Sequence, residues 1–173
     1  MIGFLKRFRR FRKDEGGYSS VELVICATTF LSGFFWVFET GLIMTKQMML
    51  ERAVDMTVRD LRLFSNPLFT HDYIKDEICD LALVFKDCDT QLLLEMDTFD
   101  PASGFNQTYT CYDKKNDITP VTTWAPGARS EIVYMRACII IDPMMPHGIA
   151  LFPGVSDKGI PLIASTAFVN EPE

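Results

Sequence analysis

The chain has 173 residues, of which 48% are hydrophobic and 23% charged, and its formal net charge is −6. This length allows one domain of ordinary size together with one anchoring segment. The acidic balance argues against nucleic-acid binding, because phosphates require a basic protein surface.

The first 17 residues form a basic leader. Residues 1–13 contain six lysines and arginines and no acid, and Asp14 and Glu15 follow directly. The rest of the chain has 11 basic and 21 acidic residues, a formal net charge of −10. A basic stub in front of an apolar run marks the cytoplasmic side of a membrane, so we expect the leader to lie in the cytoplasm.

Residues 23–44 form an apolar run. As a helix, 22 residues extend ~33 Å, about the thickness of the hydrocarbon core of a membrane. Glu39 is the only charged residue inside the run, near its far end, where it can reach the membrane interface. A cleaved secretory signal fits less well, because the run is long and no small-residue cleavage site follows it. Cys26 is interpreted as a small apolar residue of the helix.

The start of this helix has a capping signal. Ser19 or Ser20 is expected to be the N-cap, and Glu22 stands three residues after Ser19, which is the capping-box spacing.

The helix is predicted to continue beyond the apolar run, from about residue 20 to 65. Residues 45–64 contain no Gly or Pro, and Asn66-Pro67 ends the segment. Apolar residues recur there at helical spacing on one face. They are Leu50, Val54, Val58 and Leu61.

The C-terminal part is predicted to be α+β, with a small antiparallel sheet and a short helix. Thr70 is expected to cap a helix over residues 71–84. Four segments rich in β-branched and aromatic residues are expected to be strands, and because they do not alternate with helices the sheet should be antiparallel. They are residues 91–99, 108–114, 131–142 and 162–169.

Four cysteines follow the apolar run: Cys79, Cys88, Cys111 and Cys138. On the exported side of a membrane they predict two disulfides, for which three connectivities exist. We favour Cys79–Cys88, which joins a helix end to the start of the next strand, with Cys111–Cys138 joining two strands. The spacing lacks the close ligand pairs of a zinc site, so no metal is expected.

No catalytic residue and no cofactor site are predicted. His71 is expected to open the short helix, and His147 lies in a proline-rich turn; neither belongs to a recognisable triad. Trp124, in a proline-rich loop, has two interpretations: a lid on the sheet or an exposed partner contact. Several acids are interpreted as the solvated face of the short helix: Asp72, Asp76, Glu77 and Asp80.

The segment directly before the apolar run, KDEGGYSSVEL, resembles the type IV prepilin processing site. The resemblance implies cleavage between Gly17 and Tyr18 by a membrane-embedded prepilin peptidase. Glu22 is then the fifth residue after the cut. In pilin families such a carboxylate pairs with a subunit's N-terminal amine, which implies that Glu22 sets the register of assembly.

The C-terminal end resembles TadE-like proteins. Residues 162–172 (LIASTAFVNEP) look like the closing strand of that family, and residues 132–136 (IVYMR) like the strand before it. Cys79 and Cys88 match a cysteine pair between the family's short helix and first strand. Leu23 stands where some relatives have Tyr after the glutamate, so TadE and its relative TadF both remain open.

This resemblance implies a minor pilin of a Tad (Flp) pilus, with a role in pilus assembly, surface adhesion and biofilm formation. Its regions would be a leader over 1–17 removed on maturation, a helix over 18–66 and a periplasmic domain over 67–173. Its partners would be prepilin peptidase, other pilin and minor pilin subunits, the assembly platform and the inner membrane, with no nucleic acid. The alternative is an unprocessed single-pass periplasmic binding module, in which Gly17 and Glu22 have no special role.

Overall fold

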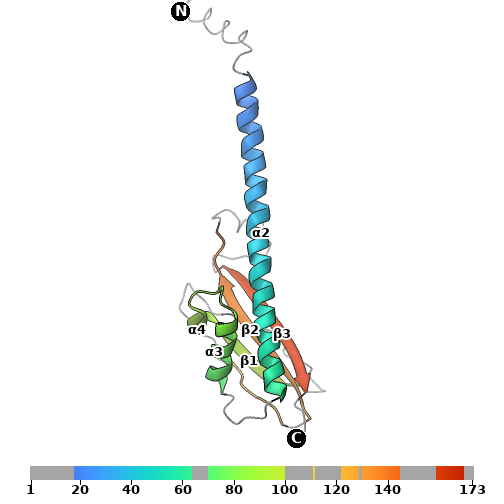
Figure 1. Cartoon of the computed structure of the whole chain (residues 1–173). Helices are drawn as coiled ribbons and strands as arrows, with labels where there is room; N and C mark the ends of the chain where they lie inside the picture. Colours follow the sequence, from blue (N-terminus) through green and yellow to red (C-terminus); the bar gives the residue numbers. More distant parts are fainter. Residues whose placement is uncertain are drawn as a thin grey trace, which may run out of the picture. The chain divides into compact units, whose positions relative to one another are not determined.

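A computed structural model of the chain describes residues 18–63, 70–99, 111, 122–128, 130–144 and 159–169. Figure 1 shows their helices and strands. The chain divides into two compact units, Met1–Thr40 and Gly41–Glu173. The division falls inside the long helix, because the part of the helix after Thr40 shares a core with the sheet.

Helix α2, Tyr18–Leu63, has 46 residues and confirms the long helix predicted from the sequence. It begins at Tyr18, so Ser19 and Ser20 lie inside the helix, and the expectation that one of them caps it is wrong. An N-cap residue has non-helical backbone geometry and receives a hydrogen bond from an amide further along the chain. Serines that are themselves helical do not have that geometry.

Within the unit Gly41–Glu173, α2 buries one face against the sheet domain. Leu50 is fully buried, and Val54 and Val58 are 2% and 5% exposed. These residues recur every four positions, which places them on one side of the helix. The amphipathic pattern seen in the sequence therefore corresponds to the packing of this half of the helix.

The sheet contains three antiparallel strands in the order β1-β2-β3: Leu93–Thr98, Ile132–Ile141 and Ile160–Val169. This confirms the α+β class with an antiparallel sheet. Side chains on alternate positions join the helices in one buried cluster. From the strands these are Leu94, Met96, Val133, Met135, Ala137, Ile139, Ile141, Leu162, Ala164 and Phe168.

Strand β3 begins earlier than predicted and includes Pro161, which pairs with Ile140 of β2. The carbonyl oxygen of Ile163 accepts a hydrogen bond from Gln47 Nε2 at 2.8 Å, so it faces away from β2. Pro161 stands two positions earlier and faces the same way. Its missing N–H therefore removes no hydrogen bond from the β2–β3 ladder, which is why proline is tolerated in an edge strand.

Two short helices precede the sheet. Helix α3, His71–Leu81, is capped by Thr70, whose side chain accepts a hydrogen bond from Tyr73 N at 3.3 Å, as predicted. Helix α4, Cys88–Gln91, was not predicted, and it ends at Gln91, where the sequence predicted the start of a strand. Its four residues form a single turn, too short for a periodic pattern to reveal.

Residues 122–128 lie beside β1. Met96 donates its N–H to Thr123 O at 3.0 Å and accepts from Ala125 N at 2.8 Å. Trp124 lies between Thr123 and Ala125 in the sequence. Its side chain is half-buried and packs against the core, which supports its interpretation as a lid. The predicted strand over 108–114 lies outside the described residues except for Cys111, which is not in a strand, and His147 lies outside them as well.

Candidate membrane span and processing site

The N-terminal end of α2 presents one carboxylate. Glu22 is exposed and stands four residues after Tyr18, the first residue of the helix. A spacing of four places the two on the same face, ~6 Å apart along the helix axis. Gly17, the other residue of the predicted cleavage site, lies outside the described residues.

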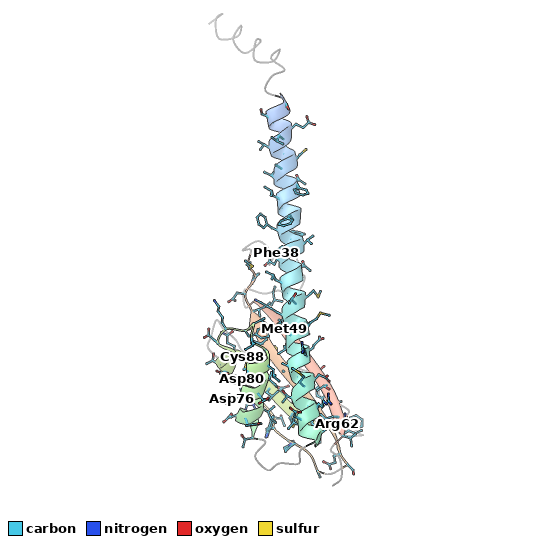
Figure 2. All side chains as sticks on the ribbon, in the orientation of Figure 1. Phe38, Met49, Arg62, Asp76, Asp80 and Cys88 are labelled. Carbon is cyan, nitrogen blue, oxygen red and sulfur yellow. A yellow bond between two sulfur atoms is a disulfide. The ribbon has the colours of Figure 1, made fainter. Side chains whose placement is uncertain are left out.

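The part of α2 that follows Glu22 is apolar on every side. Large apolar side chains project outward all round this part of the helix (Figure 2). Val37 is 76% exposed and Phe30 74%. The remaining large exposed residues of this stretch are Leu23, Val24, Ile25, Leu31, Phe34, Phe35, Trp36 and Phe38.

Hydroxyl groups in this part of the chain bind the helix's own backbone. Thr28 and Thr29 donate to carbonyl oxygens three or four residues earlier, at 2.9–3.0 Å. Ser32 and Thr40 do the same, at 2.8 and 2.9 Å. Because these donors are satisfied inside the helix, they need no water, which makes the helix compatible with a lipid environment.

By length and composition, this is a helix that can cross a membrane. An 18-residue window within Ser19–Arg62 has a mean hydropathy of 1.8, and none of that window is buried. A signal sequence near an N-terminus passes the same test. Among the described residues, α2 is the one helix with these properties.

Glu39 is buried within the protein, and the expectation that its carboxylate reaches the membrane interface stays a prediction. Only 5% of the residue is exposed. A buried carboxylate requires a partner, and Glu39 has one. Burial therefore removes the single charge of the apolar run from the helix surface.

The cysteines of the sheet domain are paired. Cys79 and Cys88 form a disulfide that joins α3 to α4, with their Cα atoms 5.7 Å apart. Cys111 and Cys138 form another, with Cα atoms 5.6 Å apart, which attaches Cys111 to β2. These are the two pairs that the sequence favoured. Cys26, on the apolar part of α2, is an exposed free thiol.

The sheet face opposite the helices holds a buried cation. Arg136 is 7% exposed, and its Nη1 lies 3.5 Å from Oε2 of Glu95. Glu95 on β1 is the residue paired with Arg136 on β2. Its Nε donates to Tyr134 Oη at 3.1 Å, and its guanidinium lies 5.0 Å from the centre of the Tyr134 ring. These contacts satisfy the charge inside the domain, so we assign Arg136 a structural role.

The surroundings of His71 are also structural. Its Nδ1 lies 3.2 Å from Asp72 Oδ1, and its Nε2 lies 3.3 Å from the carbonyl oxygen of Leu94. Its ring meets Trp124 edge to face, with ring centres 5.0 Å apart. His71 thus connects the start of α3 to β1 and to the Trp124 segment. Sequence reasoning missed this cluster because its members are far apart in the chain and form no spaced motif.

The described residues include no group of three or more His, Cys, Asp or Glu side chains that can hold a metal ion. Comparison of the chain with protein-family models, curated proteins and solved structures finds no match.

Proposed function

We propose that the chain is a minor pilin-type subunit of the TadE-like class, cleaved after Gly17 by prepilin peptidase. It takes part in the assembly of a Tad (Flp) pilus and in surface adhesion. One observation supports the proposal: the chain is helical from Tyr18 onward, and this helix presents Glu22 one turn after Tyr18, at the head of its apolar part.

The physical argument concerns the charge of Glu22. A carboxylate at the edge of a membrane-spanning helix is costly unless it is paired. Cleavage creates an ammonium group on Tyr18, and the amine of a neighbouring subunit is a suitable partner for the carboxylate of Glu22. Gly17 has no side chain, so the extended scissile segment fits a narrow protease cleft.

The anchored topology follows from the charge distribution. The basic leader favours the cytoplasm, and α2 then crosses the inner membrane once. The sheet domain lies in the periplasm, where the disulfides Cys79–Cys88 and Cys111–Cys138 form and persist. The partners are prepilin peptidase, other pilin and minor pilin subunits, and the inner-membrane assembly platform.

Two pairs of variants test the proposal. A bulky residue in Gly17→Leu blocks removal of the leader, whereas the matched control Gly16→Leu is still processed. Glu22→Gln keeps the size of the side chain and loses its charge, so the chain is cleaved but does not enter the pilus; Ser20→Ala, on the same exposed turn, behaves as wild type. If Gly17→Leu and Glu22→Gln both behave as wild type, the chain is instead an unprocessed anchored binding module.

A further inference from the structure

Five residues of α2 form a continuous stripe on the side of the helix away from the core, here called the outward stripe. Its members follow one another at spacings of four, four, three and four, which keeps them on one face. All five are exposed, with Met44 at 60% and Met48 at 72%. Met49 and Arg62, labelled in Figure 2, lie in the same part of α2. The outward stripe consists of Met44, Met48, Arg52, Asp55 and Arg59.

The charges of the outward stripe have no partner within the described part of the chain. Neither Arg52 nor Arg59 forms an ion pair with Asp55, although spacings of three and four allow one. The charged residues beside the stripe are engaged: Glu51 accepts a hydrogen bond from Gln47 at 2.6 Å, and Arg62 has an interaction of its own. Along the chain, the stripe therefore presents two methionines followed by a positive, a negative and a positive charge, and these charges are available to a partner.

The charge of the neighbouring surface makes this stripe distinct. Residues 70–91, which contain α3 and α4, have six acids and two bases, whereas residues 41–63 of α2 have three acids and four bases. The chain without its leader has a net charge of −10, so copies repel one another over most of their surface. Residues 41–63 of α2 are nearly neutral, so two copies can approach along this part of the helix without that repulsion.

We infer that the outward stripe packs against the outward stripe of a second copy of this chain, with the helices parallel and displaced by one turn. Parallel packing rests on the anchored topology of the proposed function, because two copies inserted in one membrane by the same segment run the same way. The spacing of 4, 3 and 4 from Met48 to Arg59 keeps these residues on one side of α2, where a parallel second helix can meet them along their length.

The charges select the displacement. Without displacement, each of Arg52, Asp55 and Arg59 meets its own copy, and all three pairs repel. A displacement of one turn, ~5 Å, sets Arg52 against Asp55 of the other copy and Asp55 against Arg59. The same displacement places Met44 against Met48, so the apolar part of the stripe is also matched.

Cysteine crosslinking in membranes tests the displacement and leaves the charges intact. Full-length chains carrying Cys26→Ser are co-expressed, one with Met44→Cys and the other with Met48→Cys, each with a different tag. We expect mixed Met44→Cys/Met48→Cys dimers to exceed the dimers that either variant forms with itself. Asp60→Cys, on another exposed face of α2, is the control and gives no dimer.

Exchange of charge tests the cause. Asp55→Lys makes the stripe wholly positive, and Arg52→Glu/Arg59→Glu makes it wholly negative, so each variant alone loses the dimer. Co-expression of the two restores it. Dimers of Met48→Cys with itself in excess of the mixed species, crosslinks only to a different protein, no crosslink, or no recovery on charge exchange would each overturn the inference.

The N-terminus of the same samples separates this inference from the proposed function. Leader removal with no displaced dimer contradicts the stripe inference alone. A displaced dimer with an intact leader contradicts processing and leaves the stripe inference standing.

Discussion

Gln47 on α2 donates a hydrogen bond from its side-chain amide to the backbone carbonyl oxygen of Ile163 on β3, across 116 positions of sequence and at 2.8 Å. The acceptor is on the edge strand and faces away from β2. The same amide also donates to Glu51 at 2.6 Å. One side chain therefore joins the second half of the long helix to the last strand of the sheet.

Loss of this contact should weaken the sheet domain. Gln47→Ala leaves the Ile163 carbonyl to water, and we expect a loss of about 0.5–1.5 kcal/mol in the free energy of unfolding, the usual net contribution of a hydrogen bond. The measurement is denaturant unfolding of the detergent-solubilised chain. Thr45→Ala is the control, because that hydroxyl bonds only Gly41 O of its own helix. Equal stability of the two variants would contradict the role given to Gln47.

Gly159 is predicted to be irreplaceable by alanine. Its φ is +98°, and a Cβ there would lie 2.6 Å from Ile140 Cγ2 and 2.8 Å from Ile141 O. Backbone strain alone costs on the order of 1–3 kcal/mol, and the contact with backbone oxygen adds to it. We therefore expect Gly159→Ala to lower the melting temperature of the domain.

Gly41 provides the matched control for that substitution. It lies in α2 with no atom within 4 Å of the added Cβ. Alanine is favoured over glycine in a helix by roughly 0.5–1 kcal/mol, so Gly41→Ala should hold or raise stability. A melting temperature for Gly159→Ala at or above that of the wild type would contradict the positive φ and the close contacts of Gly159.

The pair formed by Arg136 and Glu95 should be strongly coupled. Glu95→Gln leaves a guanidinium that is 7% exposed without its counter-charge. Because Glu95 itself is partly exposed, the cost should be below that of a fully buried pair, about 1–3 kcal/mol. A double-mutant cycle with Arg136→Met measures the coupling. Additive effects of the two substitutions would mean that Arg136 is stabilised mainly by Tyr134 and other contacts.

The two disulfides should both stabilise the sheet domain. Each closes a loop, and the stabilisation expected from loop closure is about 2–4 kcal/mol, larger for the longer loop. Cys111→Ser/Cys138→Ser, which opens a separation of 27, should therefore cost more than Cys79→Ser/Cys88→Ser, which opens one of 9. Melting with and without reductant checks the sum of both effects. An unchanged melting temperature would rule out a structural role.

Elements with a long periodic pattern were predictable from the sequence. The apolar run and the repeat of Leu50, Val54 and Val58 predicted the continuous helix, and β-branched segments predicted all three observed strands. The start of α3 was predictable because Thr70 combines a capping side chain with the helix that follows it. The Cys79–Cys88 pair follows the same logic, because Cys79 lies near the end of α3 and Cys88 begins α4.

Features that depend on contacts between distant segments were not predictable. From the sequence alone, Pro161 predicts the end of a strand; its place inside β3 is explained only by the edge position of that strand. The single turn of α4 is too short to produce periodicity. The cluster of His71, Leu94 and Trp124 depends on how the chain folds back on itself. The residues of the candidate processing site are adjacent in sequence, which is why a sequence pattern alone can predict such a site.

The most direct test of the proposed function is the N-terminus of the protein recovered from membranes, measured by intact mass in cells with and without prepilin peptidase. The proposal predicts a chain that begins at Tyr18 when the peptidase is present and retains residues 1–17 when it is absent. A chain that retains the leader in both strains would contradict processing and the pilin class, and would favour a permanently anchored periplasmic binding module.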